Sequence, residues 1–359
     1  MVKNLPTADA PRVLVIRRRY LGDIVLLGSV LRNLRLHWPK AQLTVLTEPA
    51  YTAVLALNPE VTTALSFPRT TPAWPAFLAA LRRARFTHVL DFDNTEKTAL
   101  LTRFTGALLR VCFDRELIKY RYPRLYTHSA KVTNAFYDTH HITDTYLELL
   151  RPLGVPVATR EVRLVPLAPD LATIAPLIGG VKSKTKNRHS QILIHPGSRS
   201  TFRLWPAERF AAVADRLQDE LGAQVFLVAG PAEQALVQEI RRHAKTHLVA
   251  LDRALTVGQF AALLSQFDVF LCHDSGPMHV AAAVGTPVVA LFSSQNATIW
   301  SPLGERHTVL QPPLPCPCFP AGQLPGPCTP GDSYKSYCVR QLTTDQVDAA
   351  TRAALLRPV

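Results

Sequence analysis

The segment RVLVIRRRYLGDIVLL, Arg12 to Leu27, decides the fold. Its apolar run at Val13–Ile16 is typical of a buried strand, and apolar residues recur at helical spacing from Ile24 to Leu36. A strand, a tight turn and a helix open a dinucleotide-binding unit, but the glycine fingerprint that cradles a pyrophosphate is absent. A Gly-Asp pair after three arginines takes its place. We therefore expect an α/β protein whose first loop has another purpose, and we do not expect an oxidoreductase.

Composition and charge limit the possible functions. The chain has 359 residues, 47% hydrophobic and 19% charged, enough for two domains of ordinary size. Its net charge is +13, and the excess of Lys and Arg lies mainly in residues 1–160. Such a surface suits nucleic acid, an anionic membrane face or a phosphorylated substrate, although a merely soluble basic surface has the same composition. No apolar run reaches the length of a membrane span and no signal-peptide core begins the chain, so we expect cytoplasmic residence.

Strand-like and helical runs alternate along the chain, which is typical of parallel α/β sheets. We expect a Rossmann-like domain over residues 1–178, within which residues 113–140 show no regular pattern. A basic linker should follow over 179–190, then a second Rossmann-like domain over 191–342 and a final helix over 343–359. Ligands of such sheets bind at the carboxyl ends of the strands, so we expect a site in a cleft.

Six cysteines are unevenly distributed. Cys112 and Cys272 lie alone in apolar runs and are expected to be buried thiols. The other four are Cys316, Cys318, Cys328 and Cys338. Their spacing departs from the paired cysteines of structural zinc sites, so a metal, a disulfide or redox pair, and reduced thiols packing a Pro-rich loop all stay open.

Two loops of the second half suit a phosphate ligand. HPGSRSTFRLWP, His195 to Pro206, follows a strand and precedes a helix, and it carries Arg199 and Arg203. FLCHDSGPMH, Phe270 to His279, has the same strand-to-helix arrangement. Free backbone amides and the helix dipole favour an anion at such a helix N-terminus, although a capped loop with surface arginines and a packed histidine would look similar. Two such loops at one sheet edge make a nucleotide-sugar site plausible.

In order along the chain, these motifs resemble glycosyltransferase family nine, the bacterial lipopolysaccharide heptosyltransferases of the GT-B architecture. The resemblance spans residues 12–350 and is nearest to the heptosyltransferase III subgroup. It rests on these segments: RVLVIRRRYLGD (12–23), LYTH (125–128), HPGSR (195–199), WPAERF (205–210), AGPAE (229–233), HDSGPMH (273–279) and CVRQL (338–342). The fold it implies is two Rossmann-like domains facing across a cleft. The activity it implies is inverting transfer of heptose from ADP-heptose to a sugar hydroxyl of the inner core.

The resemblance also implies roles for single residues. Asp23 stands where the family has its proposed general base, and a carboxylate can take the acceptor proton in a direct displacement. We expect Asp23 in an exposed cleft loop, beside Arg17, Arg18 and Arg19, which fit an anionic lipopolysaccharide acceptor. On the donor side the matching residues are Ser198, Arg199, Arg203, Glu233, Asp274, Ser275, Gly276 and His279, with Glu233 toward the nucleoside and the others toward the diphosphate and sugar.

No metal or other cofactor is expected, because no Asp-x-Asp pair ends a strand in the donor half, and amides and arginines could stabilise the departing diphosphate. Asp91 and Asp93 form such a pair in the first half. The expected partners are ADP-heptose, the anionic acceptor and the inner face of the cytoplasmic membrane, without nucleic acid. A transferase for another nucleotide sugar and a non-catalytic polyanion-binding protein remain the alternatives.

Overall fold

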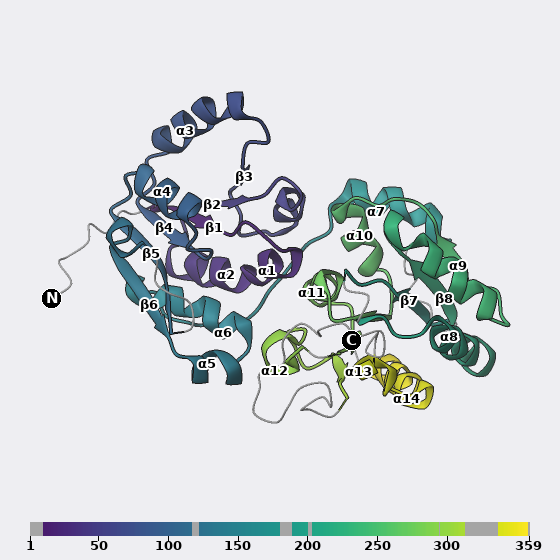
Figure 1. Ribbon diagram of the computed structural model, residues 1–359. Helices are drawn as coiled ribbons and strands as arrows, with labels where there is room; N and C mark the ends of the chain where they lie inside the picture. Colours follow the sequence, from purple (N-terminus) through teal and green to yellow (C-terminus); the bar gives the residue numbers. More distant parts are fainter. Residues whose placement is uncertain are drawn as a thin grey trace. The chain divides into compact units, whose positions relative to one another are not determined.

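Two compact units divide the chain between Val165 and Pro166. The structure, a computed structural model, describes residues 10–116, 122–179, 189–199, 203–293, 295–312 and 337–357 (Figure 1). We assigned residues 166–178 to the first domain, whereas in the structure they lie in the second unit. The physical reason is that the helix at 168–174 packs against the helix at 257–264, where Asp170 closely approaches Gly258. Most of the expected linker lies outside the described residues.

The first unit contains a six-stranded parallel sheet in the order β3-β2-β1-β4-β5-β6. Its strands are β1 (Arg12–Ile16), β2 (Gln42–Thr47), β3 (Thr63–Ser66), β4 (His88–Asp91), β5 (Leu109–Arg115) and β6 (His128–Val132). Its α-helices are α1 (Leu21–Leu26), α2 (Gly28–His37), α3 (Trp74–Arg83), α4 (Glu96–Phe104), α5 (Asn134–Thr139) and α6 (Ile142–Leu147). Its 3₁₀ helices are η1 (Thr52–Leu57), η2 (Thr71–Ala73), η3 (Pro123–Leu125) and η4 (Glu148–Leu153).

The second unit repeats this order, with the sheet β12-β11-β10-β7-β8-β9. Its strands are β7 (Gln191–His195), β8 (Gln224–Val228), β9 (Val249–Leu251), β10 (Val269–His273), β11 (Val288–Leu291) and β12 (Thr308–Leu310). Its α-helices are α7 (Ala168–Ile174), α8 (Ala207–Leu221), α9 (Gln234–His243), α10 (Val257–Leu264), α11 (Gly276–Ala283), α12 (Ala297–Trp300), α13 (Tyr337–Arg340) and α14 (Thr344–Leu356), and its 3₁₀ helices include η5 (Ala175–Ile178) and η7 (Pro231–Glu233).

The central strands are apolar because helices cover both faces of each sheet. In β1 every residue after Arg12 is buried, and β10 is buried throughout. The last helix, α14, belongs to the core of the second unit, where Val347 packs with residues of β7, β8, β10 and β11. Trp205 is fully buried there and its indole Nε1 donates to the carbonyl of Leu342 at 2.9 Å, which ties the final segment to the start of α8.

The strand order of each sheet reverses direction at one place, between β1 and β4 in the first unit and between β7 and β10 in the second. Loops that follow the two strands at such a switch point diverge to opposite faces of the sheet and leave room for a ligand. The expected α/β class with two Rossmann-like domains is confirmed. The two switch points are also where the residues selected from the sequence lie.

Candidate active site

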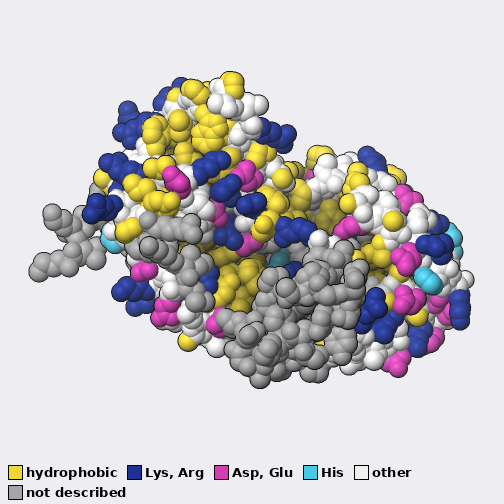
Figure 2. Space-filling view, in the orientation of Figure 1, with side chains coloured by type: hydrophobic (Ala, Val, Ile, Leu, Met, Phe, Trp, Pro, Cys, Tyr) yellow, Lys and Arg dark blue, Asp and Glu magenta, His cyan; other side chains and the backbone are white. Residues whose placement is uncertain are grey.

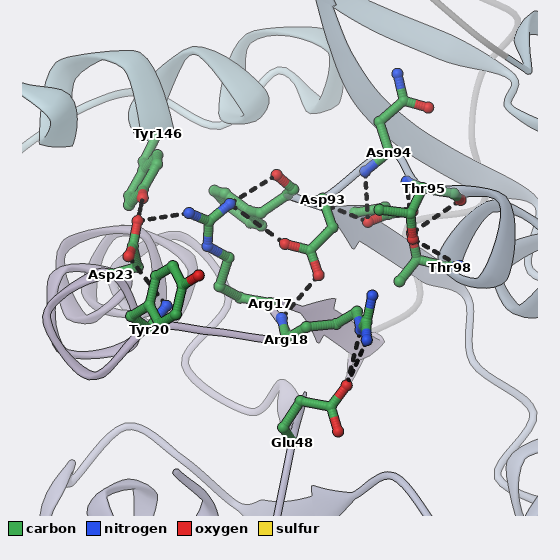
Figure 3. A network of polar contacts seen from close by, with 12 residues as sticks. Arg17, Arg18, Tyr20, Asp23, Glu48, Asp93, Asn94, Thr95, Thr98 and Tyr146 are labelled. Carbon is green, nitrogen blue, oxygen red and sulfur yellow. Dashed lines mark hydrogen bonds and ion pairs between the residues drawn. The ribbon is translucent and has the colours of Figure 1, made fainter. Parts of the chain in front are cut away.

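The switch point of the first unit carries a network of polar side chains. Arg17 follows β1, Asp93 follows β4, and Asp23 lies in the first turn of α1 (Figure 3). Because β1 and β4 pair in parallel, the segments that follow these two strands lie at the same edge of the sheet. Residues separated by 76 positions in the sequence, Arg17 and Asp93, thereby become hydrogen-bonded neighbours.

Asp23 is held by three donors. Its Oδ1 accepts hydrogen bonds from Arg17 Nη2 and from the Tyr146 hydroxyl, both at 2.5 Å. Its Oδ2 accepts from the backbone N–H of Tyr20 at 3.0 Å. Only 8% of the residue is exposed. The expectation of an exposed loop is therefore wrong: Asp23 belongs to a helix whose other residues pack on the core, and its carboxylate is directed into the network.

Arg17 lies between two carboxylates. Its Nη2 reaches Asp23, while its Nη1 donates to Asp93 Oδ1 at 3.3 Å and to the carbonyl of Phe92 at 3.1 Å. Burial disfavours the charge on Arg17, but the neighbouring carboxylates of Asp23 and Asp93 favour it, and the pKa of the guanidinium is raised. It stays a fixed cation at any pH the protein would meet.

Asp93 completes the network on the other side. Burial raises the pKa of Asp93 to about 6, and the charge of Arg17 opposes that rise. Its Oδ2 accepts the backbone N–H of Arg18 at 2.7 Å. The neighbouring Asp91 is fully buried, accepts the hydroxyl of Tyr126 at 2.7 Å, and has its pKa raised by burial. Both carboxylates, of Asp91 and of Asp93, are therefore hydrogen-bonded to groups of the protein itself.

The three arginines expected at an acceptor site differ in their surroundings. Arg17 is engaged as described, and Arg18 pairs with Glu48 Oε1 at 2.7 Å. Arg19 is exposed, with its guanidinium 5.6 Å from the centre of the Tyr20 ring. Within the part of the chain that the structure describes, Arg19 is the member of the three that forms no ion pair. Two of the three positive charges are thus balanced inside the unit.

Tyr146 was not selected from the sequence. It lies on α6, is 2% exposed, and packs edge-on against the ring of Phe92 with centroids 5.4 Å apart. Burial raises the pKa of its hydroxyl well above the usual value, so the group is a permanent hydrogen-bond donor. It is 123 residues from Asp23, and no local motif in the segment around it signals this contact.

The second unit brings the loops after β7, β8 and β10 to one sheet edge, because these strands are neighbours. Glu233, in η7 after β8, lies against the loop after β7: its Oε2 is 3.4 Å from His195 Nε2 and accepts the backbone N–H of Gly230 at 2.9 Å. The hydrogen bond with His195 lowers the pKa of Glu233. A Cβ at Gly197 would lie 2.0 Å from Glu233 Oε1, so a larger residue here would displace the Glu233 carboxylate.

Arg203 and Asp274 form an ion pair between the loops after β7 and β10. Arg203 Nη1 is 2.6 Å from Asp274 Oδ1. Asp274 is 6% exposed, and burial raises its pKa to about 7 against the lowering effect of Arg203. Its other oxygen, Oδ2, is buried and accepts no hydrogen bond from the described residues. Ser198 and Arg199 follow Gly197 on the same loop, the serine partly buried and the arginine exposed.

His273, the last residue of β10, joins the two loops. Its Nε2 accepts the backbone N–H of Trp205 at 2.8 Å, and its Nδ1 lies 3.3 Å from the carbonyl of Gly197. Burial lowers the pKa of His273 to about 3, so the imidazole is neutral and Nδ1 carries the proton it donates to Gly197. Sequence reasoning selected the segment but overlooked this residue.

The other residues selected on this loop lie at the start of α11. Ser275 is the N-cap residue, its Oγ donates to the carbonyl of His273 at 3.3 Å, and Gly276 is the first helical residue. His279 is buried in the same helix. The first backbone N–H groups of a helix lie outside its hydrogen-bond ladder and favour a phosphate oxygen. In this turn Pro277 has no N–H and the N–H of Met278 donates to the carbonyl of Ser275 at 3.1 Å, so the N–H of Gly276 is the group that suits this role. The structure thus gathers the donor-side residues on adjoining loops of one unit.

Several other expectations concern absences or cysteines. Cys112 and Cys272 are buried thiols, as expected. Cys316, Cys318 and Cys328 lie outside the described residues, as does the side chain of Cys338.

Across the described ranges, no group of three or more His, Cys, Asp or Glu side chains could hold a metal ion. Among the described helices, none combines the length and the apolar character needed to cross a bilayer.

Known proteins match this chain over most of its length. The family model described as glycosyltransferase family 9 (heptosyltransferase) matches residues 74–324. The lipopolysaccharide heptosyltransferase 3 of Escherichia coli K12 is 27% identical over 310 residues, covering 80% of this chain and 84% of the relative. In fold, the chain is similar to a family 9 glycosyltransferase from Veillonella parvula, with a TM-score of 0.78, 21% identity and coverage of 96% and 97% of the two chains.

The E. coli ADP-heptose lps heptosyltransferase II has a similar fold, with a TM-score of 0.74, 21% identity, and coverage of 96% of this chain and 98% of that one. These structural likenesses concern the fold. The family model covers well over half of the chain and agrees with the resemblance drawn from its motifs. The chain belongs to glycosyltransferase family 9, the heptosyltransferase family.

Proposed function

We propose that this protein transfers heptose from ADP-heptose to a sugar hydroxyl of the lipopolysaccharide inner core, with inversion at the anomeric carbon. The observation that carries the proposal is that each unit has a polar site at its own switch point: a buried carboxylate at Asp23 in the first unit and a phosphate-type loop cluster in the second. Family membership and the likeness to an E. coli heptosyltransferase 3 support the same donor and acceptor.

On the donor side, the proposal assigns the diphosphate to the loops after β7 and β10. The first turn of α11 offers the backbone N–H of Gly276, and Arg203 supplies positive charge. Such donors stabilise the charge that develops on a departing diphosphate. Asp274 Oδ2 has a free acceptor site among the described residues and suits a hydroxyl of the donor sugar. The remaining donor-side residues are Ser198, Arg199, Ser275 and His279, with Glu233 assigned to the nucleoside.

On the acceptor side, Asp23 is the proposed general base, and Arg19 is the exposed arginine of the three beside it. A positioned carboxylate that takes the acceptor proton contributes about 10²–10⁴-fold to the rate. The anionic inner core would be attracted by the basic charge that the sequence concentrates in its first 160 residues.

We also propose that the enzyme works at the inner face of the cytoplasmic membrane, with the side of the first unit formed by α3 and α4 toward the lipid. These helices lie side by side: Lys97 Nζ is 4.9 Å from the Trp74 ring centre, and Arg82 Nη1 donates to the carbonyl of Phe104 at 3.0 Å. Leu100 and Phe104 are 54% and 42% exposed. Figure 2 shows hydrophobic side chains gathered over α3 with Lys and Arg beside them.

The charge of this side fits an anionic bilayer. Arg82, Arg83 and Arg103 are exposed and form no ion pair with the described residues. Apolar side chains with basic residues beside them are the features of an interfacial binding surface. Replacing Leu100 and Phe104 by serine should weaken co-sedimentation with anionic vesicles, whereas Leu36→Ser, an exposed leucine of α2, should not. Equal binding by both variants would count against this surface.

A donor screen tests the function most directly. The melting temperature should be measured with ADP-heptose, other ADP-sugars, UDP-sugars and GDP-sugars, and transfer to an inner-core acceptor should be followed by mass spectrometry. A ligand at about 100 times its dissociation constant stabilises the native state by about 2.7 kcal/mol. A rise in melting temperature with UDP-sugars alone would show that the donor is a UDP-sugar and not ADP-heptose. Binding of polyanions without a rise for any nucleotide sugar would indicate a non-catalytic protein.

A further inference from the structure

The hydrogen bonds of Asp23 divide its two oxygens into different roles. A carboxylate oxygen offers about two acceptor sites. Oδ1 already accepts from Arg17 and from Tyr146, and both contacts are short at 2.5 Å. Oδ2 accepts from a single described donor, the backbone N–H of Tyr20. One oxygen is therefore filled, and the other keeps one acceptor site for a ligand.

We infer that Arg17 and Tyr146 are positioning residues that lock Oδ1 of Asp23, and that Oδ2 is the atom that takes the acceptor proton. The inference rests on the proposed function. In the step, the acceptor proton passes to Oδ2 and the acceptor oxygen bonds to the anomeric carbon of the heptose. The bond from that carbon to the diphosphate oxygen breaks, and ADP leaves with the electron pair.

Arg17 is fixed in this role from its far side. Its Nη1 is held by Asp93 and by the carbonyl of Phe92, and Asp93 is in turn held by the backbone of Arg18. Figure 3 shows the guanidinium between the two carboxylates. A planar fork that serves two carboxylates has directions that a lysine cannot reproduce. Arg17 is thus a part of the framework around the base and not a contact for the anionic acceptor.

Tyr146 fixes the same oxygen from a different element. Its ring is buried on α6 against Phe92, so the hydroxyl has a defined direction toward Asp23. The charged and titratable groups around Asp23 are then Arg17 after β1, Asp93 after β4 and Tyr146 on α6, with Tyr137 on α5 acting through Tyr146. Because each group approaches from a separate segment, the carboxylate orientation is determined by the tertiary fold.

The test separates turnover from substrate affinity. Tyr146→Phe and Arg17→Lys should each lower kcat about ten-fold to a hundred-fold, since small misplacements of a reacting group cost up to about 10²-fold. The KM values for donor and acceptor should stay within about two-fold. Tyr126→Phe is the matched control, because it removes a buried tyrosine–aspartate hydrogen bond of the same unit, to Asp91, and should leave kcat near the parent.

The outcomes distinguish a positioning role of Arg17 and Tyr146 from a role in binding the acceptor. A raised acceptor KM with unchanged kcat in Arg17→Lys would make Arg17 an acceptor ligand and overturn the inference, as would parental kcat in a folded Tyr146→Phe variant. If the parent enzyme transfers no heptose, the proposed function fails, but the positioning can still be measured. The carboxyl carbon NMR signal of Asp23, assigned with Asp23→Asn, should then move in Tyr146→Phe and not in Tyr126→Phe. An unmoved signal would overturn the positioning.

Discussion

Replacing Asp23 by asparagine should remove most of the activity and also cost stability. An amide has one accepting oxygen and one donating nitrogen. If its oxygen takes the place of Oδ1, its nitrogen faces the N–H of Tyr20, and if the amide is flipped, its nitrogen faces Arg17 and Tyr146. In both orientations a donor meets a donor at a position that is only 8% exposed.

The magnitudes follow from these contacts. The lost charge-assisted hydrogen bond should lower the free energy of unfolding by about 1.5–3 kcal/mol. For a unit of 150–250 residues, this lowers the melting temperature by roughly 3–12 °C, at about 2–4 °C for each kcal/mol. Turnover should fall about 10²–10⁴-fold, because the proton acceptor is gone. The loss of activity therefore greatly exceeds the loss of folded protein at 25 °C.

The assay measures kcat at saturating donor and acceptor, with a melting curve for each protein. Asp215→Asn is the matched control: Asp215 is equally buried, at 8% exposed, and its carboxylate accepts the backbone N–H groups of Lys245 and Thr246. It should lose similar stability and keep turnover near the parent. Turnover of Asp23→Asn within a few-fold of the parent would refute the assignment and leave Asp23 as a structural residue of α1.

Three predictions concern the second unit. Arg203→Ala should raise the donor dissociation constant, measured by calorimetry, about ten-fold or more. The control Arg216→Ala breaks an exposed ion pair of α8 and should leave the donor dissociation constant unchanged. Equal donor affinity of the two variants would make Arg203 a structural partner of Asp274 alone. Gly197→Ala should weaken donor binding, because its Cβ would displace Glu233; unaltered affinity would remove Glu233 from the donor site. Asp274 has a folded pKa of about 7 against an ordinary value of 3.8, so its contribution to stability should be lost as pH rises from about 4 to 7. Urea unfolding of Asp274→Asn should lack this part of the decline, and parallel pH curves would contradict the shift.

The sequence predicts the central parts of both sheets better than their edges. Apolar runs such as VLVI and VFLVA identify β1 and β8 because these strands are buried on both faces. β6 and the end of β5 fall where we expected no regular structure, since LRVCFDR and HSAKV contain charged residues. A strand near a sheet edge exposes part of its surface and tolerates such residues, so hydrophobicity alone does not reveal it.

The candidate site shows the same division. Asp23 and Asp274 are recognisable because they belong to local segments at the ends of strands, where a short motif carries the information. Tyr146 and the partners of Arg17 are not recognisable, because they meet through strand pairing and helix packing between distant segments. The positive charge of the RRR segment predicted an anionic ligand, whereas two of the three charges are balanced by Asp23, Asp93 and Glu48.

The neutral imidazole of His273 has a consequence for the engineering of donor preference. Because His273 ends β10 and bonds the backbones of Gly197 and Trp205, it ties the start and the end of the loop after β7 to the strand from which the other phosphate-type loop begins. A preorganised binding site loses little conformational entropy when the ligand binds, and it also adapts little to a different ligand. We therefore expect that substitutions in the segment Ala229–Glu233 can alter the preference for the nucleotide base. Substitutions at His273 should instead weaken the binding of every donor alike.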